Sequence, residues 1–158
     1  MSTTNNPSAA SVVRRFLDEV RSGRHTDRAD HYLADSVLAH QLTGEHETTI
    51  RRTPADYAEH VEDMLAEHGS FTLDILTFVA SDDLVSVVWR QTGERHPTGP
   101  WDANPVTELA ACTYRVDDCR IVEYWLLLDR LGITQQLDHP VGPPTRRSAA
   151  RPRRAGGS

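Results

Sequence analysis

Apolar residues recur at helical spacing in the first half of the chain. This spacing predicts three helices, over Ser11–Arg21, over Thr26–Leu33 and over Thr53–Gly69. The third begins with a capping threonine followed by a proline, which is typical of a helix N-terminus, and it ends at a glycine. A short strand, Val37–Leu42, is predicted between the second and third helices.

After the third helix the apolar residues follow a period of two, which predicts four strands and a last short helix from Asp129. The strands are Phe71–Ala80, Leu84–Gly93, Thr107–Val116 and Arg120–Leu128, with a loop over Arg95–Pro105. This order predicts an α+β fold, a cone-shaped α+β barrel in which three N-terminal helices pack on a strongly curved, mostly antiparallel sheet. A binding site is expected at the open mouth of the cone.

Composition changes at both ends of the chain. Residues 1–10 are small and polar, and residues 140–158 are rich in Pro, Gly, Ser and Arg, so both segments are predicted to be disordered around one domain over residues 11–139. The C-terminal segment holds five arginines and no acidic residue, which leaves twelve arginines against 23 acidic residues in the remainder. So acidic a body argues against nucleic acid and anionic membranes as partners.

All 17 basic side chains are arginine, because the chain has no lysine. This excludes a Schiff-base aldolase, a lysine-anchored pyridoxal phosphate and a phosphate loop with its lysine. The eight histidines lack a convincing metal-ligand spacing, so neither a metal nor a cofactor is expected. A turn at Asp117-Asp118 would place Cys112 opposite a residue near Glu123, so Cys112 and Cys119 do not suit a disulfide. The polar N-terminus does not resemble a signal peptide, so we expect reduced thiols and a cytoplasmic protein.

The last predicted strand ends in an acidic residue, Asp129. Alternation puts Glu123, Trp125 and Leu127 on the same face of that strand as Asp129. One interpretation makes Asp129 the N-cap of the following helix. The other makes it an acid/base carboxylate at the mouth of an apolar cavity. Both faces of the strand are largely apolar, so one is expected to cover the helices and the pocket and the other a second sheet or subunit. An outward apolar face favours a homodimer.

Other residues are candidates for the same site. His40 can serve as a base or hydrogen-bond donor, since a histidine pKa lies near neutrality, although a structural role is equally expected from its position. Gln91 would orient a carbonyl or enolate if it faces inward, and it shares a strand face with Trp89. An aromatic wall for a flat substrate could include Trp89, Trp101, Trp125 and Tyr32. Arg115 is the expected partner of a buried Glu123.

The segment IVEYW-x3-D-x-LG-x2-QQL at residues 121–137 resembles the C-terminal signature of the SnoaL-like polyketide cyclases, which belong to the nuclear transport factor 2-like superfamily. The segments VVRRFLDEV, ADSVLAHQ and DDLVSVVWRQTGE are also similar to that family. The resemblance covers roughly residues 11–138. It implies that Asp129 is the catalytic acid/base, that a polar residue near His40 shares its pocket, and that Thr113 lies on the strand that contributes polar residues to the site.

The resemblance further implies a cofactor-free cyclase that closes a ring on a polyketide-derived intermediate in natural-product biosynthesis. An aldol route would begin with Asp129 removing a proton next to a carbonyl, and a cycloaddition would use the residue only to position the substrate. The SnoaL-like proteins also include hydroxylases and epoxide-opening enzymes, which remain alternatives. A non-catalytic, small-molecule-binding dimer is the competing class, because a cavity alone does not make an enzyme.

Overall fold

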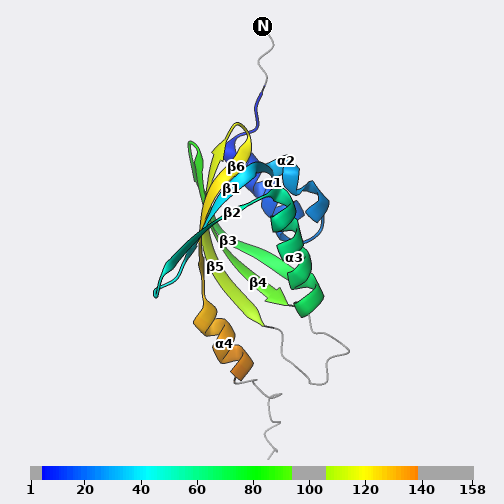
Figure 1. Cartoon of the computed structure of the whole chain (residues 1–158), viewed down its shortest axis with the longest axis vertical. Coiled ribbons are helices and arrows are strands. Elements are labelled where there is room, and N and C mark those ends of the chain that lie inside the picture. Colours follow the sequence, from blue (N-terminus) through cyan, green and yellow to red (C-terminus); the bar gives the residue numbers. More distant parts are fainter. Residues whose placement is uncertain (1–4, 94–105, 139–158) are drawn as a thin grey trace, which may run out of the picture.

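The computed structural model describes residues 5–93 and 106–138 and contains one six-stranded sheet in the order β2-β1-β6-β5-β4-β3 (Figure 1). The strands are β1 Leu33–Leu42, β2 Glu47–Arg52, β3 Phe71–Ser81, β4 Leu84–Gly93, β5 Thr107–Asp117 and β6 Arg120–Leu128. Strand β1 runs parallel to β6, and every other pair of neighbours is antiparallel. The mostly antiparallel sheet is therefore as predicted.

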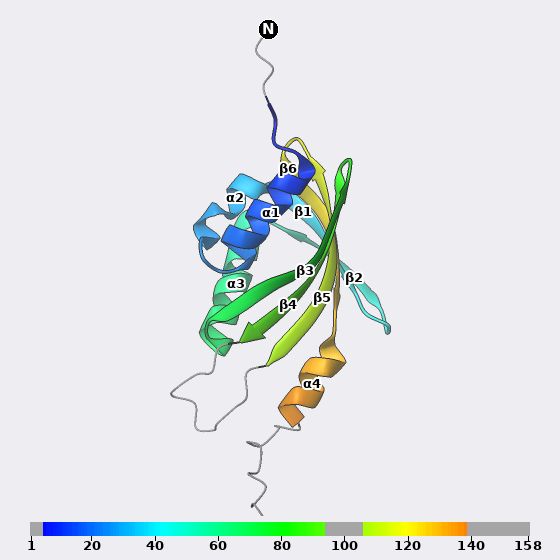
Figure 2. The same cartoon turned by 180° about the vertical axis from the view of Figure 1, so that it is seen from behind.

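The first three α-helices cover one face of this curved sheet, and the last helix lies beyond the end of β6, as Figures 1 and 2 show. Helix α1, Ala9–Phe16, is capped by Ser8 and continues through a π-helical turn, Leu17–Arg21. A 3₁₀ turn, Thr26–Arg28, leads into the short α2, Ala29–Tyr32. Helix α3, Pro54–His68, and helix α4, Arg130–Asp138, complete the set. The α+β cone with a short C-terminal helix is confirmed, and α1 begins two residues earlier than predicted.

The capping of α3 shows how local sequence sets these boundaries. The Thr53 hydroxyl accepts a hydrogen bond from the Asp56 amide, and the Asp56 carboxylate accepts one from the Thr53 amide. This reciprocal capping box satisfies two amides that a helix N-terminus leaves without partners. Gly69 ends the helix with φ +75°, a left-handed conformation that favours glycine.

Strand β2 was not predicted, because its sequence ETTIRR has no apolar alternation and five of its six residues are exposed. It is an edge strand paired only with β1, so the inward-outward pattern that reveals the other strands is missing. Strand β1 also begins four residues earlier than expected, at Leu33.

The turn between β5 and β6 corrects one predicted register. Cys112 was expected opposite a residue near Glu123, but it pairs with Leu126. The two turn residues are Asp118 and Cys119, both with positive φ, and the pairing shifts by one further residue between Arg115–Glu123 and Val116–Ile121. Together these shift the pairing along β6. Both cysteines are free, as predicted.

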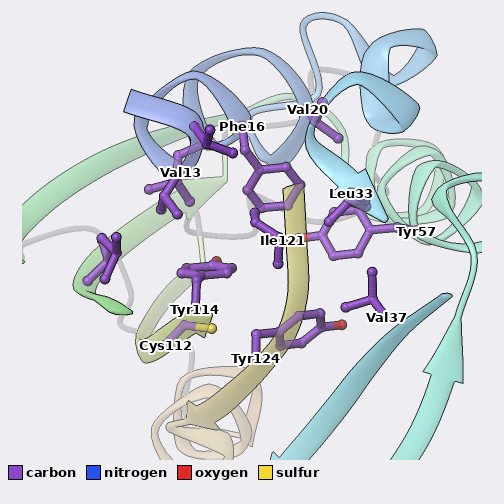
Figure 3. Close-up of a cluster of buried hydrophobic side chains, with 14 of the residues drawn as sticks. Val13, Phe16, Val20, Leu33, Val37, Tyr57, Cys112, Tyr114, Ile121 and Tyr124 are labelled. Atoms are coloured by element: carbon purple, nitrogen blue, oxygen red, sulfur yellow. The ribbon is translucent and has the colours of Figure 1, made fainter. Parts of the chain in front are cut away.

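The core lies between the helices and the concave face of the sheet. Val13, Phe16 and Val20 from the first helical segment are fully buried against Tyr114 of β5 and Ile121 of β6 (Figure 3). The ring centroids of Phe16 and Tyr114 are 5.8 Å apart in an edge-on arrangement that aromatic pairs favour. The side of β5 that carries Cys112 and Tyr114 therefore faces the helices.

Candidate functional site

A cavity of about 150 Å³ lies between α3 and the concave face of the sheet. Its aromatic wall consists of Tyr57 from α3, Trp89 from β4, Tyr114 from β5 and Tyr124 from β6. Figure 3 shows three of these side chains, with Cys112 beside Tyr114. Because alternate residues of a strand share a face, the parity of β4, β5 and β6 brings these rings together.

Charged residues line the same cavity from three directions. Arg21, from the π-helical turn, places Nη2 3.4 Å from Oε1 of Glu108 on β5, and both side chains are largely buried. The Arg21 guanidinium also lies 5.3 Å from the Trp89 ring centroid. Arg52 reaches the cavity from the edge strand β2, where it pairs with the buried Val37 and so points to the concave face.

Four buried polar atoms, three of them on residues that line this cavity, lack a hydrogen-bond partner in the part of the chain that the structure describes. They are Nη1 of Arg21, Nε of Arg52, Nε1 of Trp89 and Oε1 of Gln91. Gln91 lies two residues beyond Trp89 on the same strand face and pairs directly with Glu108. Buried polar groups in native proteins are almost always paired with the protein or with ordered water, so these atoms make this side of the sheet a candidate place for water or a polar ligand.

Burial keeps the phenols and the thiol of the cavity protonated. Desolvation raises the pKa of Tyr124 to about 12, and it raises the pKa values of Tyr57 and Tyr114 well above their ordinary range. Desolvation also raises the pKa of Cys112 to about 12. These groups can therefore donate hydrogen bonds near neutral pH, but they cannot act there as bases or as a thiolate nucleophile.

His60 on α3 is the imidazole of this cavity and lies at its exposed rim. Partial desolvation lowers the pKa of His60, and the nearby positive charges of Arg52 and Arg21 lower it further. The neutral form, which can accept a proton, is therefore favoured at physiological pH. His60 was not predicted as a site residue, because nothing in its helical spacing separates it from an exposed surface histidine.

The structure places His40 on the opposite, outer face of the sheet. Its Nδ1 lies 2.8 Å from Oγ1 of Thr49, and its Nε2 lies 2.7 Å from Oε2 of Glu123. The His40 ring also stacks on Trp125, with centroids 5.2 Å apart. Arg115 approaches Glu123 to 3.6 Å, which confirms the predicted pairing of these two residues.

Asp129 lies at the end of β6 with an exposed side chain and caps α4. Its Oδ1 accepts a hydrogen bond of 2.9 Å from the Gly132 amide. A Cβ at position 132 would meet the Asp129 carboxylate, so the glycine three residues after the aspartate leaves room for this cap. Asp129 is not among the residues that line the concave cavity.

The remaining predicted residues are distributed over the molecule. Trp89 and Gln91 lie on the concave side, whereas Thr113 faces outward and donates to or accepts from Ser86 at 2.8 Å. Tyr32 lies at the end of α2, where its hydroxyl donates to Glu19 at 2.6 Å. Trp101 lies outside the described residues. The structure therefore brings together Trp89 and Gln91 but separates them from Trp125, Thr113 and Tyr32.

A second hollow is a larger, open groove of about 1040 Å³ between the first helical segment and the edge strand β3. Arg14 stacks over the Phe78 ring there, 4.0 Å from its centroid. The four unpaired buried atoms belong to the inner side of the sheet, not to this groove. The smaller cavity is therefore the candidate site.

Within residues 5–93 and 106–138, no three His, Cys, Asp or Glu side chains are grouped as a metal ion would require. In that same part of the chain, no helix has the length and apolar character needed to cross a membrane.

Comparison with known proteins gives a family match over most of the chain. The family model described as SnoaL-like polyketide cyclase matches residues 11–137. A search of the curated proteins found no match. Among solved structures, a candidate polyketide cyclase from Acidithiobacillus ferrooxidans is 28% identical with a TM-score of 0.68, and the match covers 87% of this chain and 98% of that one.

Two other solved structures share the fold at lower identity. An LEH-like epoxide hydrolase from M. tuberculosis is 21% identical with a TM-score of 0.59, and the match covers 82% of this chain and 88% of that one. AclR, a candidate hydroxylase from Streptomyces galilaeus, is 16% identical with a TM-score of 0.62, and the match covers 86% of this chain and 85% of that one. These neighbours carry different chemistry on one architecture, so the fold does not identify the reaction.

Proposed function

Since the chain belongs to the SnoaL-like polyketide cyclase family, we propose that it is an enzyme that closes a ring on a polyketide-derived molecule bound in the concave cavity. The observation that carries this proposal is the composition of that cavity. It combines a wall of aromatic rings with protonated phenols and one imidazole whose lowered pKa favours the neutral form. A flexible, carbonyl-rich substrate would be held against the rings in a reactive conformation, and such positioning can lower the activation free energy by several kcal/mol.

The proposed reaction exchanges protons and forms one carbon–carbon bond. His60 takes a proton from the carbon next to a substrate carbonyl, and the resulting enolate carbon attacks a second carbonyl carbon. The tyrosine hydroxyls donate hydrogen bonds to the alkoxide that forms, which then receives the proton. No oxidant or reductant is consumed, so the step requires only a positioned base and hydrogen-bond donors.

Asp129 is the rival acid/base residue, as the family resemblance implies. Its carboxylate is exposed and engaged in capping α4, so this role would require the substrate to reach the end of β6. His60 is the better candidate because it lines the cavity that also holds the aromatic wall. The two roles make different predictions for single substitutions.

The test is turnover of polyketide intermediates by single variants of the whole chain, with the product detected as a change of retention at constant mass or with loss of one water. His60→Gln should lower turnover about 10²- to 10⁴-fold, because a positioned general base contributes about that factor. His68→Gln is the matched control, since His68 is exposed two turns further along α3. It should leave turnover unchanged.

Asp129→Asn preserves the cap and removes the charge, so it isolates the acid/base role of that residue. Full loss of turnover in Asp129→Asn with normal turnover in His60→Gln would transfer the role to Asp129. If both variants turn over substrate as fast as the parent chain, neither residue is the acid/base, and the cavity would promote cyclisation only by holding the substrate in a reactive conformation. Tight binding of intermediates without any turnover would identify a binding protein instead of an enzyme.

We also propose that the outer face of the sheet pairs with a second copy of the chain. This face holds a hollow lined by Val79, Val88, Trp125 and Leu127, and two of these are large exposed hydrophobics. The charges of Glu123 and Arg115 beside it compensate one another, so facing copies would not bury an unpaired charge. Leu127→Arg should turn a dimer into a monomer in light scattering, whereas a monomeric parent chain would refute the interface.

A further inference from the structure

The strongest unexplained feature of the cavity is its two arginines, because few acceptors lie within hydrogen-bond distance of their N–H groups. Arg21 is only 6% exposed, and among the described residues Glu108 alone accepts a hydrogen bond from its guanidinium. Its Nη1 has no partner there, nor does Nε of Arg52. A buried donor without an acceptor is destabilising, so both nitrogens are available to an acceptor that residues 5–93 and 106–138 do not supply.

The charges around the cavity specify the sign of that acceptor. The ionised lining residues are Arg21, Arg52 and Glu108, because the phenols and the thiol are protonated and the neutral form of His60 is favoured. Among the lining residues this leaves one net positive charge, and the exposed carboxylate of Asp56 outside the cavity is near enough to Arg52 for that guanidinium to lower its pKa. A ligand with a single negative charge balances the net charge of the lining, whereas a dianion such as phosphate would leave an excess of negative charge.

The shape of the donors specifies the kind of anion. A guanidinium presents its donors in a plane and matches a planar pair of oxygens. Trp89 Nε1 adds a neutral donor beside Arg21. The donors thus suit a planar anionic group.

We propose that the substrate carries a planar oxyanion, either a carboxylate or the enolate of a 1,3-dicarbonyl, which binds between Arg21 and Arg52. This inference rests on the proposed function and adds the substrate class to it. The apolar remainder of the molecule lies against the tyrosine wall. Glu108 acts as a positioning residue, because its hydrogen bond occupies Arg21 Nη2 and directs the remaining donors to the ligand.

The test measures binding of small flat probes to the full chain by titration calorimetry. The probes are 2-naphthoate, its uncharged methyl ester, and 1,3-indandione, whose enolate forms near neutral pH. The carboxylate should bind about tenfold or more tightly than the ester, because charge-assisted hydrogen bonds to a buried arginine are worth at least that factor. Tighter binding of the indandione enolate than of naphthoate would identify the enolate as the preferred anion, and the reverse would identify the carboxylate.

Two substitutions test the arginines, each with a matched control. Arg52→Gln should reduce the preference for naphthoate over its ester about tenfold. Arg51→Gln should leave that preference unchanged, because the Arg51 side chain points to the outer face of β2, where it donates to Ser36 of β1. Arg21→Gln should have the same effect as Arg52→Gln, with the exposed Arg24→Gln as its control. Arg52 is only half-buried, so the Arg52 pair remains informative if the Arg21 variant fails to fold.

The outcomes separate this inference from the proposed function. Met64→Trp fills the cavity and should prevent binding there. If naphthoate and its ester bind the parent chain equally and neither binds Met64→Trp, the oxyanion proposal is overturned but the cavity remains the binding site. Binding of naphthoate that Arg52→Gln leaves unchanged would also overturn it. If Met64→Trp binds the probes as tightly as the parent chain does, the probes bind outside the cavity, and the cavity is not the site of the proposed function.

Discussion

The two faces of the central sheet use the same residue types in opposite ways. On the outer face, both ring nitrogens of His40 have partners and Glu123 joins His40 to Arg115. On the concave face, His60 has no hydrogen-bond partner among the described residues, and Arg21 and Arg52 keep donors unpaired. A polar network in which every group has a partner has no need of a ligand, whereas unpaired donors can be satisfied by ordered water or by a ligand.

This contrast changes which histidine is the better candidate. His40 lies on a strand and beside an acid, which makes it attractive in the sequence, yet its imidazole is committed to Thr49 and Glu123. His60 shares its cavity with the aromatic wall and the two arginines. Availability for a substrate, and not the identity of the residue, separates the two.

The largest expected effect on stability distinguishes Trp89 on the concave face from Trp125 on the outer face. Trp89→Ala should lower the free energy of unfolding by about 3–5 kcal/mol, because Trp89 is 2% exposed and its removal leaves a cavity. Trp125→Ala, on the outer face, should cost about 1–2 kcal/mol. Urea denaturation measures both. Equal losses would mean that the two faces do not differ in packing as described.

A smaller effect is expected at the cap of α4. Asp129→Ala should destabilise that helix by about 1 kcal/mol, since the Gly132 amide loses its acceptor. Asp129→Asn keeps a side-chain oxygen and should retain most of the stability. Hydrogen exchange of the α4 amides reports the difference, and identical exchange in the two variants would contradict the capping role.

The smallest expected effect is the pH dependence that His60 contributes. Because the pKa of folded His60 is lowered, the unfolded chain takes up this proton at a higher pH than the folded chain does. Stability should therefore fall as pH drops below the ordinary histidine pKa of about 6.5, and should be unaffected well above it. His60→Gln should flatten this part of the profile in urea denaturation, whereas His68→Gln should leave it unchanged. A steeper profile in His60→Gln would reverse the sign of the argument.

Alternation along the sequence was sufficient to predict four strands and the α+β arrangement, but not which face of each strand points inward. Ala111, Thr113 and Arg115 on one side of β5 and Cys112 and Tyr114 on the other give the same period. The helices decide between them, because Phe16 packs on Tyr114. The predicted site therefore mixed residues from both faces.

The two arginines show a different limit of sequence reasoning. Arg21 follows Leu17 by four residues on the apolar side of its helical segment, so a charge on a buried face was a signal that could have been read. Arg52 ends a polar edge strand that has no apolar pattern at all. Only its pairing with Val37 in the folded sheet directs it to the cavity.

The most direct test of the central claim is to ask which face of the sheet a ligand touches. The chain has three tryptophans, and their indole N–H signals can be assigned by single Trp→Phe variants. Addition of 2-naphthoate should shift the Trp89 signal, because its Nε1 is an unpaired donor at the cavity, and should leave the Trp125 signal in place. A shift of Trp125 with an unchanged Trp89 would put the ligand on the outer face and contradict the account.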